Sequence, residues 1–135
     1  MRYRLIIEYD GAEFCGWQSQ ADGRAVQDAL QHAIASFCGE TVTVYGAGRT
    51  DSGVHARGQV AHIDLDTAPQ PDRVRDGINF HLRPTPVAVR AAHYARADFD
   101  ARFSAIARHY RYRIISQRAP VVLARDQAWW VPQPL

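Results

Sequence analysis

The spacing of apolar side chains changes several times along the chain, and these changes restrict the folds that it can adopt. From Arg2 to Asp10 apolar and polar residues alternate, which is typical of a strand with one buried face. Between Ala25 and Cys38 the apolar residues recur at helical spacing, and Gly39 follows as a suitable left-handed cap. The same criteria predict further strands at Thr41–Tyr45, Val60–Asp66, Val87–Tyr94 and Arg108–Ser116, and a second helix that begins at Pro71 and ends before Pro84.

The predicted order is strand, helix, strand, strand, helix, strand, with one additional strand at the end. The first six elements form the split βαβ pattern of ferredoxin-like α+β domains, so we expect an antiparallel sheet with two helices on one face. If the opposite face is apolar, it must be covered by RNA, another domain or a second subunit. We assign residues 1–118 to this domain. Residues 119–135 read as a tail or linker, because no element is evident for Val121–Leu123 and Trp129–Val131 to pack on.

The composition excludes several classes of protein. Hydrophobic residues make up 47% of the 135 residues, which suffices for the core of one domain and differs from a disordered chain. No apolar run approaches the about 18 residues of a membrane span, and no signal-peptide core follows Met1, so we expect a soluble cytoplasmic protein. Cys15 and Cys38 lie in no paired-cysteine motif, so we expect neither a disulfide framework nor a zinc site.

Charge is distributed unevenly along the chain. All 16 basic residues are Arg; residues 1–66 contain five Arg and nine acidic residues, whereas residues 67–135 contain 11 Arg and five acidic residues. Eight of the Arg fall between Arg83 and Arg118, where five aromatic residues are interleaved with them. A basic stretch with interleaved aromatic residues is a candidate surface for nucleic acid.

Two connections, residues 10–24 and 46–59, are longer than a compact domain requires, and loops of this length are often functional. The second contains four glycines and two Arg together with Asp51, Ser52 and His55. A phosphate-binding P-loop is excluded because the chain has no Lys, and a dinucleotide-binding loop is disfavoured because Asp51 stands where its third glycine belongs.

Three interpretations of this loop remain at the level of residue types. Ser52, His55 and Asp51 contain the groups of a nucleophilic triad but lack the elbow motif around the serine. His55 and His62 could bind a metal, although their spacing matches no ligand rule. Asp51 alone can attack covalently or take a proton, or it only forms an Asx-type turn within its own loop.

The segment from Gly48 to Val60 reads Gly-Arg-Thr-Asp-Ser-Gly-Val-His-Ala-Arg-Gly-Gln-Val and closely resembles the signature of the tRNA pseudouridine synthase A family. Other segments are similar to family motifs in the same order, and the resemblance extends from the first strand to about residue 116. These segments are Tyr9–Gln20, Val26–Gln27, Ile78–Leu82, Phe99–Ala105 and Arg108–Tyr112.

The resemblance implies a cofactor-free isomerisation of uridine to pseudouridine in the anticodon stem-loop of tRNA, at tRNA positions 38–40. It places the essential carboxylate on Asp51, which either adds covalently or draws a proton from the sugar. Tyr110 would stack on the target base, with core packing beside Tyr112 as its alternative, and Arg49 would extrude the base or hold a phosphate. The implied RNA-contacting stretch comprises Phe99, Asp100, Ala101, Arg102 and Phe103.

The chain also departs from the family. Ser52 stands where the family often has Ala, and Arg83 separates Leu82 from Pro84 in the family's Leu-Pro step. The family's proteins are about twice as long, with a similarly folded second half that completes the sheet and the cleft and supplies a second Arg. We therefore expect this chain to be the N-terminal half, weakly active or inactive alone.

The expected partner is tRNA, bound through its anticodon arm, together with a second copy of the chain in a homodimer formed through sheet or tail surfaces. No membrane contact is expected. The alternative function is a non-catalytic RNA-binding module of the same fold, although His109–Ile114 lacks the RNP1 pattern of such modules.

Overall fold

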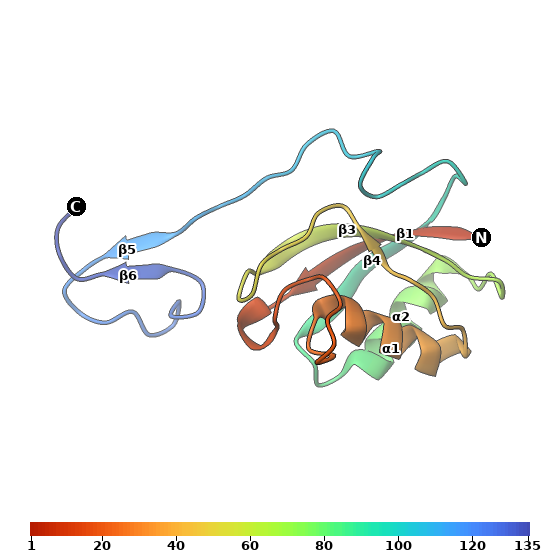
Figure 1. Ribbon diagram of the computed structural model, residues 1–135, viewed down its shortest axis with the longest axis horizontal. Coiled ribbons are helices and arrows are strands. Elements are labelled where there is room, and N and C mark those ends of the chain that lie inside the picture. The colour runs from red at the N-terminus through yellow and green to blue at the C-terminus, as the bar shows by residue number, and fades with distance from the viewer. The chain divides into compact units, whose positions relative to one another are not determined.

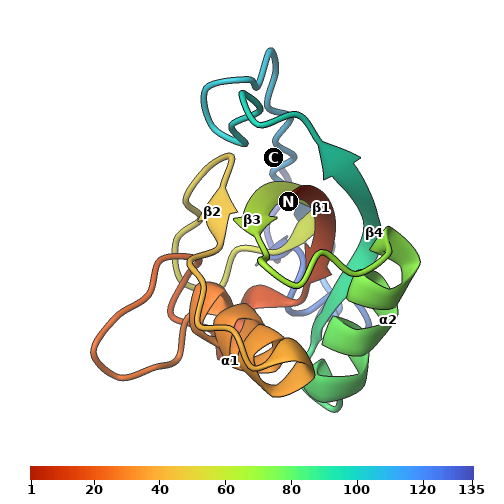
Figure 2. The same ribbon diagram turned by 90° about the vertical axis from the view of Figure 1, so that its right-hand side faces the viewer.

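Strand β1 (Arg2–Tyr9) lies inside a four-stranded sheet in the computed structural model, which describes residues 1–135. It pairs with β3 (Ala56–Asp64) on one side and with β4 (Val87–Ala95) on the other, and β3 pairs with β2 (Tyr45–Gly46). The order is β2-β3-β1-β4 and every pair is antiparallel (Figure 2). The predicted ferredoxin-like α+β fold is confirmed.

Helices α1 (Val26–Cys38) and α2 (Pro71–Leu82) cover one face of the sheet (Figure 1). The alternating apolar residues of β1 face them, and burying each such aliphatic side chain contributes about 1.5–3 kcal/mol. The sequence alternation therefore marks the face that the helices cover. Fully buried side chains of this layer are Tyr3, Leu5, Ile7, Leu30, Ile34, Ile63, Val74 and Ile78.

The helices end where the sequence predicts. Gly39 adopts φ 75° after α1 and its N–H donates to the carbonyl of Ala35 at 2.8 Å, while Pro71 begins α2. Gly77 lies inside α2, where a glycine weakens a helix. A Cβ atom at Gly77 would overlap the ring of Phe37 on α1, so this glycine allows the two helices to approach closely.

The predicted strand Thr41–Tyr45 is wrong over most of its length, since only Tyr45 and Gly46 pair with β3. The reason lies at Val44, which is buried but uses its backbone elsewhere. Its N–H donates to the side-chain oxygen of Gln31 at 3.1 Å, and its carbonyl accepts from the side-chain amide of Gln27 at 2.8 Å. Helix α1 thus satisfies the backbone groups that a strand partner would otherwise take.

The chain divides into two units, residues 1–105 and 106–135, and each is described by itself. In the second unit β5 (Ile114–Ser116) and β6 (Trp129–Val131) form a parallel pair. The predicted strand Arg108–Ser116 is therefore wrong before Ile114, because alternation alone supplies no hydrogen-bonding partner. The tail, for which no element was evident, provides the partner of β5.

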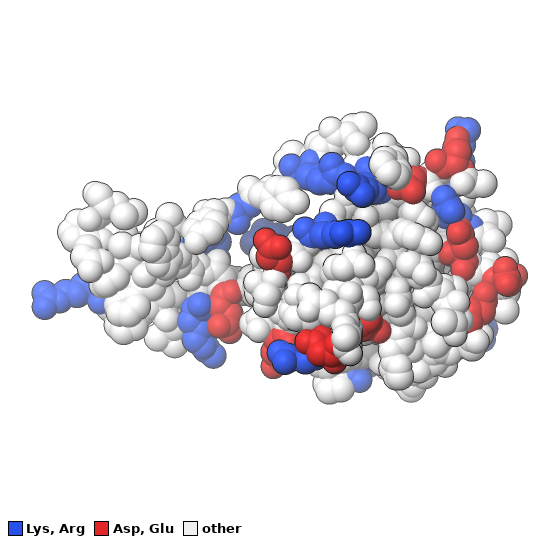
Figure 3. Space-filling model, viewed as in Figure 1, with Lys and Arg blue, Asp and Glu red and all other residues white.

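The division after Ala105 precedes the domain end expected at residue 118, and the assignment of residues 1–118 to one functional half stays a prediction. The Arg-rich stretch Arg83–Arg118 is distributed over both units. On the face shown in Figure 3, acidic side chains lie among the arginines, so this face does not carry a single sign of charge. Cys15 and Cys38 are free thiols, and neither helix has the length and apolar character needed to cross a membrane.

Candidate active site

The two long loops predicted to be functional pack against each other. We call residues 10–24 the first loop and residues 46–59 the second loop, although the strand predicted to begin at Val60 begins at Ala56, so the second loop includes the start of β3. The backbone N–H of Trp17 donates to the carbonyl of Thr50 at 3.0 Å, and the hydroxyl of Ser52 donates to the carbonyl of Phe14 at 3.2 Å. The hydroxyl groups of Tyr9 and Thr50 are hydrogen-bonded at 2.8 Å. Residues on both sides of Asp51 are thus tied to the first loop or to the end of β1.

Glycines make this close approach possible. A Cβ atom at Gly11 would overlap the carbonyl of Val54, and one at Gly16 would lie 2.7 Å from the carbonyl oxygen of Thr50. A Cβ atom at Gly46 would lie 2.7 Å from the indole of Trp17, which is 2% exposed. Any side chain at these three positions would push the loops apart, since such distances are shorter than van der Waals contact.

Asp51 begins a tight turn in the second loop. The N–H of Val54 donates to the backbone carbonyl of Asp51 at 3.1 Å, and Gly53 adopts φ +81°, a region that glycine enters without strain. The turn is closed by the Asp51 carbonyl, while its carboxylate is exposed and takes part in no hydrogen bond or ion pair of the structure. An Asx-type turn, the structural alternative for Asp51, is therefore not formed.

The second loop is also closed at its base. The Gln59 side-chain amide donates to the carbonyl of Gly48 at 2.6 Å, and the Ala47 N–H donates to the carbonyl of Val60 at 2.8 Å. Arg49 projects from this base with an exposed side chain. No ion pair joins Arg49 to Asp51, although the two residues are close in sequence.

The triad interpretation is wrong for this structure, because Ser52 and His55 have other partners. Ser52 donates to the first loop, and Nδ1 of His55 accepts from the N–H of Gly11 at 2.9 Å. The Asp10 carboxylate also lies 3.2 Å from this nitrogen. His55 helps to fix the first loop, and no group of three metal-ligating side chains exists in the chain.

The predicted RNA-contacting stretch separates into anchoring and exposed residues. Ala101 is 2% exposed and its N–H donates to Nδ1 of His62 at 3.0 Å, and Phe99 is partly buried. Asp100 caps the following turn. Its carboxylate accepts from the N–H groups of Arg102 and Phe103, each at 2.9 Å, and these bonds lower the pKa of Asp100 below its usual value.

The outward-facing residues of this stretch form a cation–aromatic pair. The Arg102 guanidinium lies 5.5 Å from the ring centroid of Phe103, and the Phe103 side chain is 81% exposed. An exposed aromatic ring beside a guanidinium is a suitable platform for an unstacked base.

Tyr110 belongs to the second unit, where it precedes β5 and is 75% exposed. The alternative of core packing is therefore wrong for Tyr110, and Tyr112 beside it is 80% exposed. Asp51 lies in the first unit and Tyr110 in the second.

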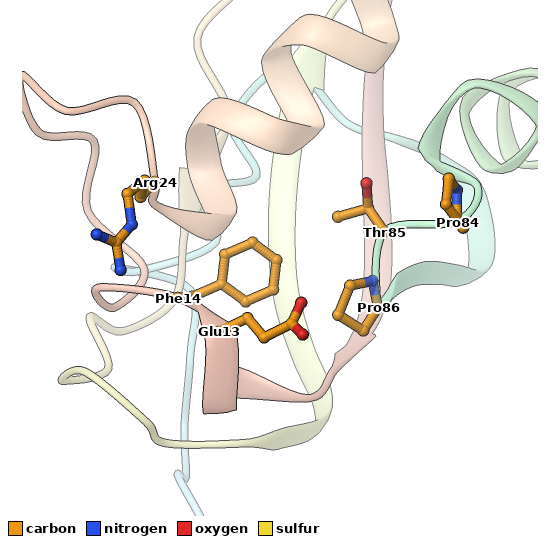
Figure 4. Close-up of a pocket in the computed structure, with 6 residues that line it drawn as sticks. All are labelled: Glu13, Phe14, Arg24, Pro84, Thr85 and Pro86. Carbon is orange, nitrogen blue, oxygen red and sulfur yellow. The ribbon is translucent and has the colours of Figure 1, made fainter.

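A pocket of about 350 Å³ lies beside the first loop (Figure 4). Glu13, Phe14 and Arg24 of the first loop form part of its wall, and the connection between α2 and β4 forms the rest through Pro84, Thr85 and Pro86. None of the predicted site residues lines this pocket, so the pocket and the candidate catalytic carboxylate are separate features.

Gln27 is a positioning residue whose role sequence reasoning missed. Its amide donates to the carbonyl of Val44, and its side-chain oxygen accepts from the N–H of Ser19 at 2.8 Å, so it joins α1, the segment just before β2 and the first loop. Its position at the start of an apolar helix face, with little exposure, was the available signal. No comparable signal in the sequence reveals the contacts of Gly11, Gly16 and Gly46. A glycine indicates that another segment can come close, but it does not indicate which segment does so.

The fold and the site together define a ferredoxin-like domain that presents an unpaired carboxylate on a loop held between glycines. Residues 5–104 match the sequence model of a family described as tRNA pseudouridine synthase, and the chain belongs to this family. The match includes both loops, Asp51 and the Phe99–Phe103 stretch. The resemblance inferred from the motifs is confirmed.

Curated relatives named tRNA pseudouridine synthase A agree with this membership. The protein of Methylobacterium sp. (strain 4-46) is 58% identical over 134 residues, which cover 99% of this chain and 54% of the relative. The proteins of Parvibaculum lavamentivorans and Rhodopseudomonas palustris (strain HaA2) are 54% and 55% identical, over 99% of this chain and 54% and 55% of their own lengths. The chain thus spans about half the length of the curated relatives it matches.

Proposed function

We propose that this chain is the N-terminal half of a tRNA pseudouridine synthase and carries its catalytic carboxylate. The target is uridine at tRNA positions 38–40 in the anticodon stem-loop, and the product is pseudouridine. The observation that carries the proposal is the Asp51 carboxylate, which is exposed and unpaired at the tip of a loop that is fixed on both sides of it. A reactive group held in this way meets the geometric requirement of catalysis.

The reaction needs no redox partner. The bond from the ribose C1′ to N1 of uracil breaks, the uracil rotates, and a bond forms from C1′ to C5. The proton lost from C5 is balanced by one gained at N1, so the product has the composition of the substrate. Asp51 acts either by covalent addition or by removing a proton from the sugar, and both roles require an ionised carboxylate.

Access to the glycosidic bond requires the target base to leave the helical stack, at a cost of a few kcal/mol. Stacking on an aromatic side chain offsets part of this cost, and we assign that role to Tyr110. Arg49 would hold a phosphate or help to extrude the base from beside the Asp51 turn. Phe99, Asp100, Ala101, Arg102 and Phe103 form the proposed RNA-contacting stretch, with Arg102 and Phe103 making the direct contacts.

We further propose that the active protein contains a second half that supplies a cation for Asp51, is a homodimer and works in the cytoplasm. The unpaired state of Asp51 supports the need for a cation from outside this chain. The exposed apolar side chains of the second unit support association. Sedimentation velocity tests the homodimer: a species of twice the monomer mass is expected, and a monomer at the highest soluble concentration would contradict it.

The catalytic proposal is tested by incubating unmodified tRNA with the full-length protein and mapping pseudouridine in the anticodon arm. Wild type should form pseudouridine at positions 38–40, and Asp51→Ala should form none while still binding tRNA. Asp66→Ala removes another exposed loop carboxylate of the same unit and should behave as wild type. Product from Asp51→Ala at the wild-type level would contradict the catalytic role. Binding without product in the wild type would instead support the RNA-binding module.

A further inference from the structure

A histidine is buried on the face of the sheet that no helix covers. His62 of β3 lies opposite Arg4 of β1, and Arg4 points away from the face that carries the core residues of β1. His62 is nevertheless only 2% exposed. Tyr45 stacks on its ring with centroids 4.9 Å apart, and Phe99 contacts it edge-on at 6.2 Å. Buried polar side chains in native proteins have specific partners, so His62 requires an explanation.

The partner of His62 is the backbone of the Phe99–Phe103 stretch. Its Nδ1 accepts from the N–H of Ala101 at 3.0 Å, and both residues are buried. A ring nitrogen that accepts a hydrogen bond carries no proton, so the imidazole is neutral with its proton on Nε2. Without this acceptor the Ala101 N–H would be buried and unsatisfied.

Two other side chains complete the attachment. Arg2 forms a bidentate ion pair with Asp64, with both N–O distances 2.9 Å, and donates to the carbonyls of Ala97 and Phe99. Asp100 then caps the turn that carries Arg102 and Phe103, as described above. The segment is thus fixed to β1 by Arg2, fixed to β3 by His62, and folded outward by Asp100.

We propose that His62 is a positioning residue for RNA recognition: its neutral imidazole holds the Asp100–Ser104 turn against the sheet, so that the Arg102–Phe103 pair has a fixed orientation toward RNA. This inference rests on the proposed function, in which Arg102 and Phe103 contact tRNA. His62 itself touches no substrate, because it is buried beneath Tyr45 and Phe99. Its effect is transmitted through the backbone of Ala101.

Protonation of His62 would oppose this arrangement. A proton on Nδ1 would face the Ala101 N–H, donor against donor. Burial lowers the pKa of His62 below its ordinary value of 6.5, and Arg2 acts in the same direction, whereas Asp100 and Asp64 oppose them. The ring is therefore neutral at neutral pH, and acidification releases the turn. The titratable and charged groups that face His62 are Arg2 and Arg4 of β1, Tyr45 of β2, Asp64 of β3 and Asp100 of the turn.

The test compares two substitutions in the full-length protein. His62→Phe keeps a flat ring beneath Tyr45 but cannot accept the Ala101 hydrogen bond, whereas His62→Gln offers a side-chain oxygen as acceptor. We expect His62→Phe to raise the tRNA dissociation constant and KM about tenfold with kcat nearly unchanged, because a buried N–H loses its partner. His62→Gln should recover most of the affinity. Wild-type affinity should fall at a pH below 6.5, where the buried His62 takes up a proton, and His62→Gln should lack this step.

A second comparison separates positioning from general stabilisation. In the Arg102→Ala/Phe103→Ala background, His62→Phe should have no further effect on tRNA affinity, because the residues it positions are gone. An equally large effect in that background would overturn the proposal, as would wild-type affinity in His62→Phe or a loss confined to kcat. If His62→Phe does not fold, the proposal is tested by the tRNA affinity of His62→Gln and by the pH dependence of the wild-type affinity.

The proposed function fails separately from this inference. Pseudouridine formation by Asp51→Ala would contradict the catalytic assignment, while the dissociation constants of the His62 variants would still test the positioning role. Loss of product in Asp51→Ala together with unaltered tRNA affinity in His62→Phe would contradict only the positioning role.

Discussion

The two units of the chain, residues 1–105 and residues 106–135, differ in how far their apolar side chains are buried. In the first unit each of β1, β3 and β4 has a strand partner, and the apolar face of the sheet is covered by α1 and α2. In the second unit the only strands are the three-residue β5 and β6. Large apolar side chains of that unit are mostly exposed: Ile106, Tyr110, Tyr112, Ile114, Val122, Leu123, Trp129 and Trp130.

The difference shows that hydrophobic patterning produces stable structure only where a partner surface is present. A two-stranded pair without a covering layer is marginally stable in water, whereas a sheet packed on two helices is an independent folding unit. Exposed apolar side chains in such number are typical of a surface that contacts another surface. We expect the second unit to gain its stability from a partner outside this chain.

The largest effect is expected when the chain is divided into its two units and the folding of each piece is measured. Residues 1–105 alone should show a cooperative thermal transition by circular dichroism, because they contain the whole layered core. A peptide of residues 106–135 should show none, because a segment this short without disulfides rarely folds alone. A sigmoidal transition in the peptide, or the absence of one in residues 1–105, would contradict the claim that only the first unit folds alone.

A pair of leucines gives the next largest effect. Leu5 is 0% exposed in the centre of β1, whereas Leu123 of the second unit is 97% exposed. Leu5→Ala should lower the free energy of unfolding by about 2–5 kcal/mol, because it removes buried surface and leaves a cavity. Leu123→Ala should change it by less than about 0.5 kcal/mol. Urea denaturation measures both, and equal effects of the two substitutions would contradict the assignment of the core.

The contact between the two loops is tested by a pair of glycines. Gly11→Ala should destabilise the fold by about 1–3 kcal/mol, since its Cβ atom would overlap the carbonyl of Val54. It should also slow pseudouridine formation about 10- to 100-fold, because the Asp51 turn would be displaced. Gly58→Ala is the control: its Cβ atom would lie 3.7 Å from Ile6, an ordinary contact. Wild-type rates for Gly11→Ala would show that loop packing does not position Asp51.

Acidification should affect the first unit in two steps of smaller size. The pKa of His62 is lowered by burial, so the unfolded state binds the proton first and stability falls as pH drops below 6.5. The Arg2 hydrogen bonds lower the pKa of Asp64, and backbone N–H groups lower that of Asp100, so their contributions are lost as pH falls below 3.8. Melting temperatures measured against pH should show both steps, and His62→Phe should lack the upper one.

Much of the first unit could be predicted because its elements have strong local signals. The helices, β1 and β4 were located from periodicity and capping residues such as Gly39 and Pro71. The errors occurred where a nonlocal contact decides the structure. The side chains of Gln27 and Gln31 bond the backbone groups of Val44, which therefore joins no strand, and no partner strand lies beside Arg108–Tyr112.

The candidate site shows the same division between local and nonlocal information. Loop length and motif identified the segment around Asp51, because both are properties of contiguous residues. Gly11, Gly16 and Trp17 of the first loop contact the second loop, which lies far away in the sequence, so periodicity could not reveal these contacts. His62 was considered only as a metal ligand, since nothing in the sequence links it to Ala101.

The most direct test of the central claim is the single-turnover rate of pseudouridine formation by Asp51→Asn in the full-length protein. This substitution keeps the size of the side chain and removes its charge. We predict no detectable product with a tRNA dissociation constant within about twofold of wild type, because the carboxylate acts on the reacting bond and not in binding. Asp66→Asn should match wild type in both measurements. Pseudouridine formation by Asp51→Asn at the wild-type rate would contradict the claim.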